Sequence, residues 1–186
     1  MAYQFKIQLK KVTKPPVWRQ VVVPEDFSFH KFHILIQIVF GWENSHLYQF
    51  CPKGYGSRPT IAIPLKDDWE KPDMNATKIK LTQIFTAEKQ TFTYIYDFGD
   101  DWIHQITLEK ILPDMIKHPF CMAGKGTCPP EDCGGPWGYE NLKMIMADPK
   151  HEEHYEMKEW MGLEEDEEWD AAYFDLDEVN EILEEF

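Results

Sequence analysis

Alternation of polar and apolar residues with a period of two is the feature that most limits how this chain can fold. It runs through residues 3–10, 91–96 and 102–111. Such alternation is typical of strands that bury one face and leave the other in water. The second and third of these strands flank residues 97–101, where Gly99 can adopt a positive φ, so they are predicted to form a β-hairpin.

A helix is predicted between the first strands and this hairpin. Residues 17–23 form a second expected strand, and an apolar stripe at three- and four-residue spacing then predicts a helix that Asp26 or Ser28 caps and Gly41 ends. The stripe consists of Phe29, Phe32, Ile36, Val39 and Phe40. The same helix carries three polar residues that are expected to face solvent, namely His30, His33 and Gln37.

Shorter elements are predicted along the rest of the chain. They are a strand at 47–51, an extended piece at 60–63 within an irregular connection over 52–76, and a segment at 78–85 that fits either a short helix or a strand. Residues 113–138 are predicted to form a loop, because they are rich in proline, glycine and cysteine. Helices are predicted at 138–146, 149–161 and 175–186.

The order of these elements predicts an α+β protein. We expect a mixed, mainly antiparallel sheet with helices packed on one side and a helical C-terminal region. The opening strand–strand–helix–strand succession is reminiscent of a β-grasp. Residues 1–162 are expected to form a single α+β domain, and residues 163–186 an acidic linker and a C-terminal helix docked on it. The docking is expected because apolar residues repeat at helical spacing after residue 175, namely Leu176, Val179, Ile182, Leu183 and Phe186.

The formal net charge of −14 is concentrated at the C-terminal end. Residues 151–186 carry sixteen Asp and Glu and one Lys, whereas residues 1–150 carry seventeen Asp and Glu and eighteen Lys and Arg. A balanced body and an acidic end predict no strong binding of nucleic acid. The acidic end instead suits a basic protein partner.

The lack of long apolar segments predicts the cellular compartment and the absence of membrane contact. No apolar run is long enough to span a bilayer, and the first residues lack the apolar core of a secretory signal. A cytoplasmic location without membrane contact is therefore expected. In that compartment, the four cysteines are expected to be thiols or metal ligands rather than disulfides.

Several groups of residues match a known family. They are 16–19, 40–42 with His46 and Leu47, 96–100 with Trp102 and His104, 128–135 with Gly138 and Tyr139, and 174–175 with Asn180. On these residues the chain resembles the plasmid pRiA ORF-three-like family, whose members are often labelled TnpR-like passenger proteins of insertion elements. The resemblance runs from about residue 3 to residue 183. It implies an association with mobile elements and no established biochemical activity.

The resolvase label can be tested against the residue types that the chain contains. Recombinases hold the scissile phosphate with several arginines, because the guanidinium fork matches phosphate oxygens. This chain has two arginines, Arg19 and Arg58, and three serines. Resolvase or recombinase activity is therefore not expected.

Acidic residues and histidines around the predicted hairpin turn form a candidate metal site. The candidates are His46, Asp97, Asp100, Asp101, His104, Glu131 and Asp132. Carboxylates with one or two imidazoles suit Mg²⁺, Mn²⁺ or a catalytic Zn²⁺. The alternative is a tight turn whose aspartates bond the local backbone. We also expect segments 42–46, 96–104 and 128–138 to converge on one face, with His46 and His104 on the same side.

Cysteines offer a second candidate metal site. Cys121, Cys128 and Cys133 could supply three ligands to a structural zinc ion, with a fourth from Cys51 or a histidine. Their spacing lacks the paired knuckles of most such sites. Buried or free thiols are the alternative reading.

These observations leave three functional hypotheses open. The leading one is a non-catalytic interaction module, because no complete catalytic constellation is visible. The second is a metal-dependent hydrolase or nuclease-like enzyme that uses Asp97, Asp100, His104 and Glu131. The third is a DNA-binding accessory protein, which fits the mobile-element association and fits the charge poorly.

Overall fold

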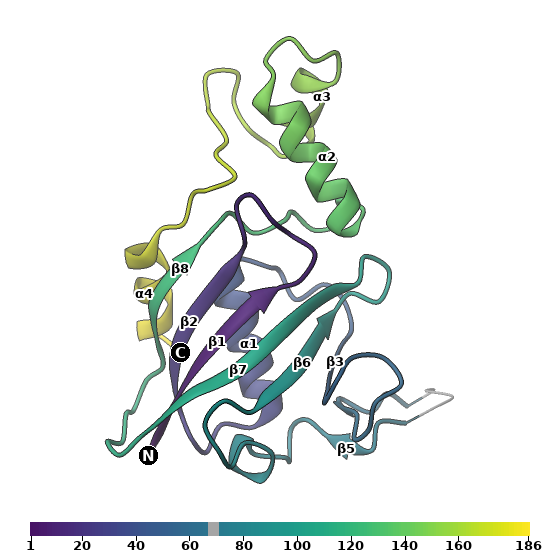
Figure 1. The fold of residues 1–186 in the computed structure, drawn as a ribbon. Helices are drawn as coiled ribbons and strands as arrows, with labels where there is room; N and C mark the ends of the chain where they lie inside the picture. Colours follow the sequence, from purple (N-terminus) through teal and green to yellow (C-terminus); the bar gives the residue numbers. More distant parts are fainter. Residues whose placement is uncertain (67–70) are drawn as a thin grey trace.

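The strands join into one sheet, and their order brings distant segments of the chain to the same end of it. In the computed structural model, which describes residues 1–66 and 71–186, the order is β5-β4-β3-β6-β7-β1-β2-β8 (Figure 1). Neighbouring strands pair antiparallel, except that β4 and β5 are parallel. The strands are β1 (Ala2–Leu9), β2 (Trp18–Pro24), β3 (Tyr48–Cys51), β4 (Ile61–Ala62), β5 (Met74–Asn75), β6 (Thr91–Tyr96), β7 (Trp102–Leu112) and β8 (Phe120–Lys125).

Helices cover one face of the sheet and lie at one end of it. α1 packs across the sheet, α4 lies beside β8, and α2 and α3 form a lobe beyond the end of the sheet (Figure 1). Their bounds are α1 (Phe29–Phe40), α2 (Gly135–Ala147), α3 (His154–Trp160) and α4 (Leu176–Glu184), with a short 3-10 helix, η1 (Leu81–Gln83). The predicted α+β class with a mainly antiparallel sheet is therefore confirmed. No helix in the described residues is long and apolar enough to span a bilayer.

The predicted alternation and helical stripe together build the core. The inward residues of β1 are fully buried under α1, where the Phe5 ring lies 4.9 Å from the Phe32 ring. Ser28, rather than Asp26, caps the helix, because its Oγ accepts the Lys31 N–H at 3.1 Å. Gly41 ends the helix at a φ of 90°, in the left-handed region that favours glycine.

The polar side of α1 faces the core, not solvent as predicted. His33 is fully buried, its ring stacks on Tyr48 at 3.6 Å, and its Nδ1 lies 2.8 Å from the Tyr94 hydroxyl. Gln37 is also buried and donates to the same hydroxyl at 3.0 Å. Burial lowers the pKa of His33 to about 4, so the imidazole is neutral at pH 7. The prediction of a solvated face is wrong for these two residues because strands β3 and β6 cover them.

Two local predictions need correction, and two segments whose structure was left open are now defined. The expected loop over 113–138 contains a strand, β8, which pairs with β2. The helix expected from 149 begins at His154, because Asp148 instead closes α2 in an extended conformation. The ambiguous segment at 78–85 contains η1. The expected connection over 52–76 includes the short strands β4 and β5, and its residues 67–70 lie outside the described part of the chain.

The C-terminal segment contacts the body through Phe174, Asn180 and Leu183, among other residues. The Phe174 ring lies 4.1 Å from the buried Arg19 guanidinium. The Asn180 carboxamide of α4 both donates to the Cys121 carbonyl at 3.0 Å and accepts the Cys121 N–H at 2.8 Å. Leu183 is buried against the core.

Candidate metal centre

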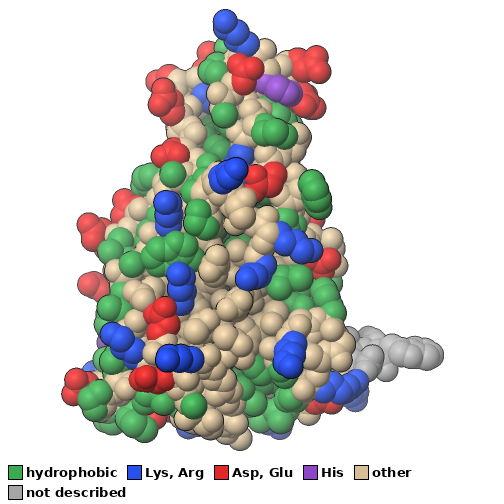
Figure 2. Space-filling view, in the orientation of Figure 1, with side chains coloured by type: hydrophobic (Ala, Val, Ile, Leu, Met, Phe, Trp, Pro, Cys, Tyr) green, Lys and Arg blue, Asp and Glu red, His purple; other side chains and the backbone are tan. Residues whose placement is uncertain are grey.

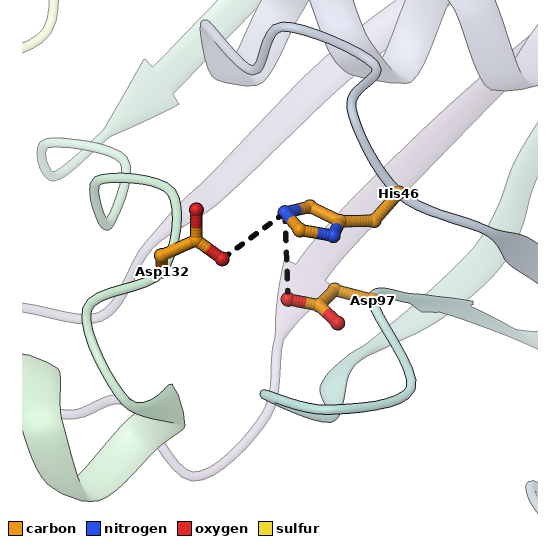
Figure 3. Close-up of side chains that lie close together, drawn as sticks. All are labelled: His46, Asp97 and Asp132. Atoms are coloured by element: carbon orange, nitrogen blue, oxygen red, sulfur yellow. Dashed lines mark ion pairs between the residues drawn. The ribbon is translucent and has the colours of Figure 1, made fainter.

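A histidine and three carboxylates meet where the turn between β6 and β7 faces the loop before α2. Figure 3 shows His46 with two of these carboxylates, Asp97 and Asp132. The His46 Nε2 atom lies 3.3 Å from Asp132 Oδ1, 3.6 Å from Glu131 Oε2 and 3.8 Å from Asp97 Oδ2. Ligand atoms of His46, Asp97 and Asp132 all lie within 4.8 Å of one another, which no other group of three His, Cys, Asp or Glu in the described residues matches. We call these four residues the His46 cluster.

Backbone geometry aims Asp97 into the cluster. This residue follows β6 directly and has a φ of 55°, and Asp101 at the other end of the turn has a φ of 58°. The positive φ thus falls on two aspartates and not on Gly99 as predicted. Aspartate tolerates this conformation because its carboxylate can bond the nearby backbone. Asp97 Oδ1 accepts the Gly99 N–H at 2.8 Å, which leaves Oδ2 directed at His46.

Glu131 is held by hydrogen bonds to one of its two oxygens. Oε1 accepts the Tyr96 hydroxyl at 2.8 Å and the Glu43 N–H at 3.0 Å. The same hydroxyl accepts the Ser45 N–H at 3.0 Å, so Tyr96 also fixes the backbone next to His46. Burial, reinforced by the Glu131 carboxylate, raises the pKa of Tyr96, which keeps this hydroxyl a donor.

Two atoms at the centre of the cluster are buried and have no hydrogen-bond partner. They are His46 Nε2 and Glu131 Oε2. Their separation of 3.6 Å exceeds the 2.7–3.2 Å that is roughly usual for N–H···O bonds. A buried polar atom without a partner costs about 1–3 kcal/mol, so such atoms in a folded protein require an explanation.

The loop before α2 is tied to the turn and to the end of α1. Asp100 Oδ2 accepts the Gly134 N–H at 3.1 Å. The Trp42 indole donates to the Pro129 carbonyl at 3.0 Å. The three segments expected to converge therefore do meet. Asp132 forms the open side of the cluster, with 75% of its side chain exposed.

The remaining acidic and histidine candidates lie outside the cluster. Asp101 accepts a hydrogen bond from the Tyr55 hydroxyl at 2.5 Å, and Asp100 serves the loop contact described above. His104 is fully buried in the core, where its ring lies 4.9 Å from Phe40 and 5.1 Å from Trp42. Burial lowers the pKa of His104 to about 3, so its imidazole is neutral at pH 7. Asp100 and Asp101 thus make contacts within the turn region, and His104 packs in the core.

The three cysteines do not form a second cluster in the described residues. Cys121 lies on β8, and its thiol donates to the Ala123 carbonyl at 3.4 Å. Burial raises the pKa of all three thiols, that of Cys133 to about 12. These features fit the alternative of buried thiols better than a structural zinc site.

Tyr96 is the residue of this site that the sequence did not identify. Alternation over 91–96 assigns it to the core, and its ring is indeed buried. Its hydroxyl nevertheless reaches the cluster edge. The available signal was its position directly before Asp97 in the family motif.

Fold and site together define a class, an α+β sheet protein whose β6–β7 turn and the loop before α2 enclose a histidine–carboxylate cluster. The chain belongs to the family of plasmid pRiA4b ORF-3-like proteins, whose family model matches residues 1–178. It is 35% identical over 182 residues to the uncharacterized protein y4hQ of Sinorhizobium fredii (strain NBRC 101917 / NGR234), covering 97% of this chain and 89% of that protein.

A solved structure supports the same assignment. The crystal structure of the protein of unknown function MM3350 from Methanosarcina mazei Go1 superposes with a TM-score of 0.79 at 35% identity. The match covers 96% of this chain and 97% of that one. The whole α+β fold is therefore shared with this relative.

Proposed function

We propose that the protein binds one divalent transition-metal ion, Zn²⁺ or Mn²⁺, at the His46 cluster. The observation that carries this proposal is the pair of buried atoms without partners, His46 Nε2 and Glu131 Oε2. A cation between them would satisfy both atoms at once. It would also offset the charge of three converging carboxylates.

Distances within the cluster fit a shared ion. Two ligand atoms bonded to one tetrahedral ion at roughly 2.0–2.2 Å lie about 3.4 Å apart. The separations from His46 Nε2 to the three carboxylates are 3.3, 3.6 and 3.8 Å. They are thus long for hydrogen bonds. The three-residue group that fits one ion is His46, Asp97 and Asp132, because all its ligand atoms lie within 4.8 Å of one another, whereas Glu131 is placed by its 3.6 Å distance to His46.

The donor set decides which ions fit best. One imidazole with carboxylates suits Zn²⁺ or Mn²⁺, whereas Mg²⁺ prefers an all-oxygen shell. The Tyr96 hydroxyl orients Glu131, as partners of metal ligands commonly do. The Asp132 side chain is 75% exposed, so water could reach an ion held here, as metal-assisted hydrolysis requires.

Metal-assisted hydrolysis is the enzymatic function that such an open site would support. In that case His46, Asp97 and Asp132 would hold the ion and leave a fourth position for water, with Glu131 beside His46, and Asp100 and His104 would have no part in the chemistry. The test is turnover of p-nitrophenyl phosphate and p-nitrophenyl acetate by the metal-loaded protein, with H46A as the inactive comparison. A result in which neither ester is cleaved would leave metal binding without hydrolysis of these two ester classes.

Binding itself is tested by calorimetric titration of the metal-free protein with Zn²⁺, Mn²⁺ and Mg²⁺. We expect one site per chain with the order Zn²⁺ or Mn²⁺ above Mg²⁺, and a loss of at least about tenfold in affinity in H46A and E131Q. The matched control is H118A, which removes an exposed histidine from the loop after β7. The main rival is a protonated His46 paired with carboxylates. Equal metal affinity in H46A and H118A would favour that rival.

A further inference from the structure

We propose that the lobe formed by α2 and α3 is a docking surface for a basic amphipathic segment of another protein. This inference is independent of the metal site, because it rests on a different surface. The lobe lies beyond the end of the sheet (Figure 1). Its exposed side combines an apolar groove with an acidic rim.

The groove lies between the two helices of the lobe. It encloses about 250 Å³ and is lined by Leu142 and Ile145 of α2 and by Met157 and Trp160 of α3. A depression of this size accepts two or three apolar side chains. Leu142 and Ile145 form its floor, since both are buried, and Trp160 forms a wall with 47% of its surface exposed.

Large apolar side chains are also exposed on another face of α2. Trp137 is 85% exposed and Met144 is 64% exposed. They lie seven residues apart on α2, so they share one face of the helix. Tryptophan and methionine are enriched at protein interfaces, so these two side chains add to the exposed apolar surface of the lobe.

The groove borders acidic residues, because Asp132 lines it and Glu153 and Glu156 each lie four positions before a lining residue of α3. Residues 151–170 carry ten Asp and Glu, all of them exposed, and one lysine. That lysine, Lys158, is buried, and its ammonium donates to the Glu165 carbonyl at 2.7 Å. Throughout the described residues, none of these ten carboxylates forms an ion pair with a lysine or arginine. Figure 2 shows acidic side chains around the lobe, together with exposed hydrophobic ones.

Charge complementarity indicates which kind of partner binds in the groove. A second copy of the chain would bring the same acidic rim to a symmetric contact, which like-charge repulsion disfavours. Nucleic acid is disfavoured by the same repulsion. A segment with apolar residues at helical spacing and lysines or arginines on its flanks satisfies both the groove and the rim.

Position relative to the His46 cluster adds a consequence. A second hollow, of about 370 Å³, is lined by Glu131, Asp132 and Trp160 among others. Asp132 and Trp160 also line the first groove. A segment bound along the lobe would therefore reach the open edge of the cluster.

The test is selection of random peptides of about 16 residues, or roughly four helical turns, displayed on phage and presented to the full chain. We expect the recovered peptides to carry net positive charge, to place apolar residues at three- and four-residue spacing, and to bind less tightly as salt rises. Their affinity should fall at least about tenfold in W160A.

Two paired variants keep the test independent of any folding defect in W160A. E153Q/E156Q removes two exposed carboxylates beside the groove, and E178Q/E181Q removes two exposed carboxylates from α4 with the same change of net charge. The affinity for the selected peptides should fall in E153Q/E156Q and stay unchanged in E178Q/E181Q. Recovery of no peptide, of peptides without basic residues, or an equal effect of both pairs would overturn the proposal. So would a dimer in light scattering that W160A converts to a monomer, because a second copy would then cover the lobe.

Discussion

Two buried histidines make stability of this protein depend on pH in a window where few other groups titrate. Burial lowers the pKa of His33 to about 4 and that of His104 to about 3, against an ordinary value of 6.5. The folded state therefore binds fewer protons than the unfolded state between these values. For a lowered histidine pKa, the contribution to stability is present above about pH 6.5 and is lost as pH falls toward the folded pKa.

The magnitude follows from these pKa values. Between pH 7 and pH 5, each histidine costs about 2 kcal/mol of unfolding free energy, so both together cost about 4 kcal/mol. This is a large part of the roughly 5–15 kcal/mol that holds a typical domain folded. The assay is urea unfolding at a series of pH values, read by tryptophan fluorescence.

Replacement of His104 by phenylalanine isolates one of the two contributions. The His104 ring packs against Phe40, Trp42 and Tyr94, so a phenylalanine ring in H104F fills the same space. We expect the loss of stability from pH 7 to pH 5 to be about 2 kcal/mol smaller in H104F than in the wild type. An unchanged difference, or a histidine NMR signal from the folded protein that titrates near pH 6.5 and disappears in H104F, would refute the reasoning.

Three further predictions concern the site and the acidic end. Y96F should lower metal affinity by about 10–100-fold in calorimetric titration, because it removes the donor to Glu131 Oε1, and an affinity equal to wild type would argue against that role. Truncation after Gly162 should lower the melting temperature in calorimetry and expose apolar surface, because Leu183 and Phe174 leave their contacts; unchanged stability would mean a free arm. Duplex DNA should not bind with sub-micromolar affinity at physiological salt in fluorescence anisotropy, since the net charge is −14; measured binding of that strength would contradict the charge argument.

Sequence patterns correctly predicted the elements that are determined by their own residues. The helix over 29–40 and the hairpin after residue 91 follow from periodicity and capping, and both are present. Strand β8 was not predicted, because its residues, Phe120–Lys125, show no alternation of polar and apolar residues. They also lie in a proline- and glycine-rich stretch. Its strand conformation comes from pairing with β2, which is a tertiary contact.

The sequence proposed the candidate site as a set of suitable residue types. Only the structure showed which of these residues lie together. His46, Asp97, Glu131 and Asp132 come from segments that are far apart in sequence, so their convergence depends on strand order. Burial of His104 could have been predicted from the sequence, because His104 shares the alternating face of Trp102 and Ile106. Both of these residues are fully buried. Burial of His33 could not be predicted from the sequence, because the residues that cover it, Tyr48 and Tyr94, lie on strands β3 and β6.

The Asn180 side chain has a consequence for self-association of the sheet. Its carboxamide gives and takes one hydrogen bond with the backbone of Cys121, as the peptide group of a neighbouring strand would. β8 is an edge strand, and an edge with open backbone groups invites strand addition and aggregation. The opposite edge, β5, is two residues long and offers little to a templated strand. Within the described residues, the Cys121 backbone of β8 is therefore less open to strand addition from a partner.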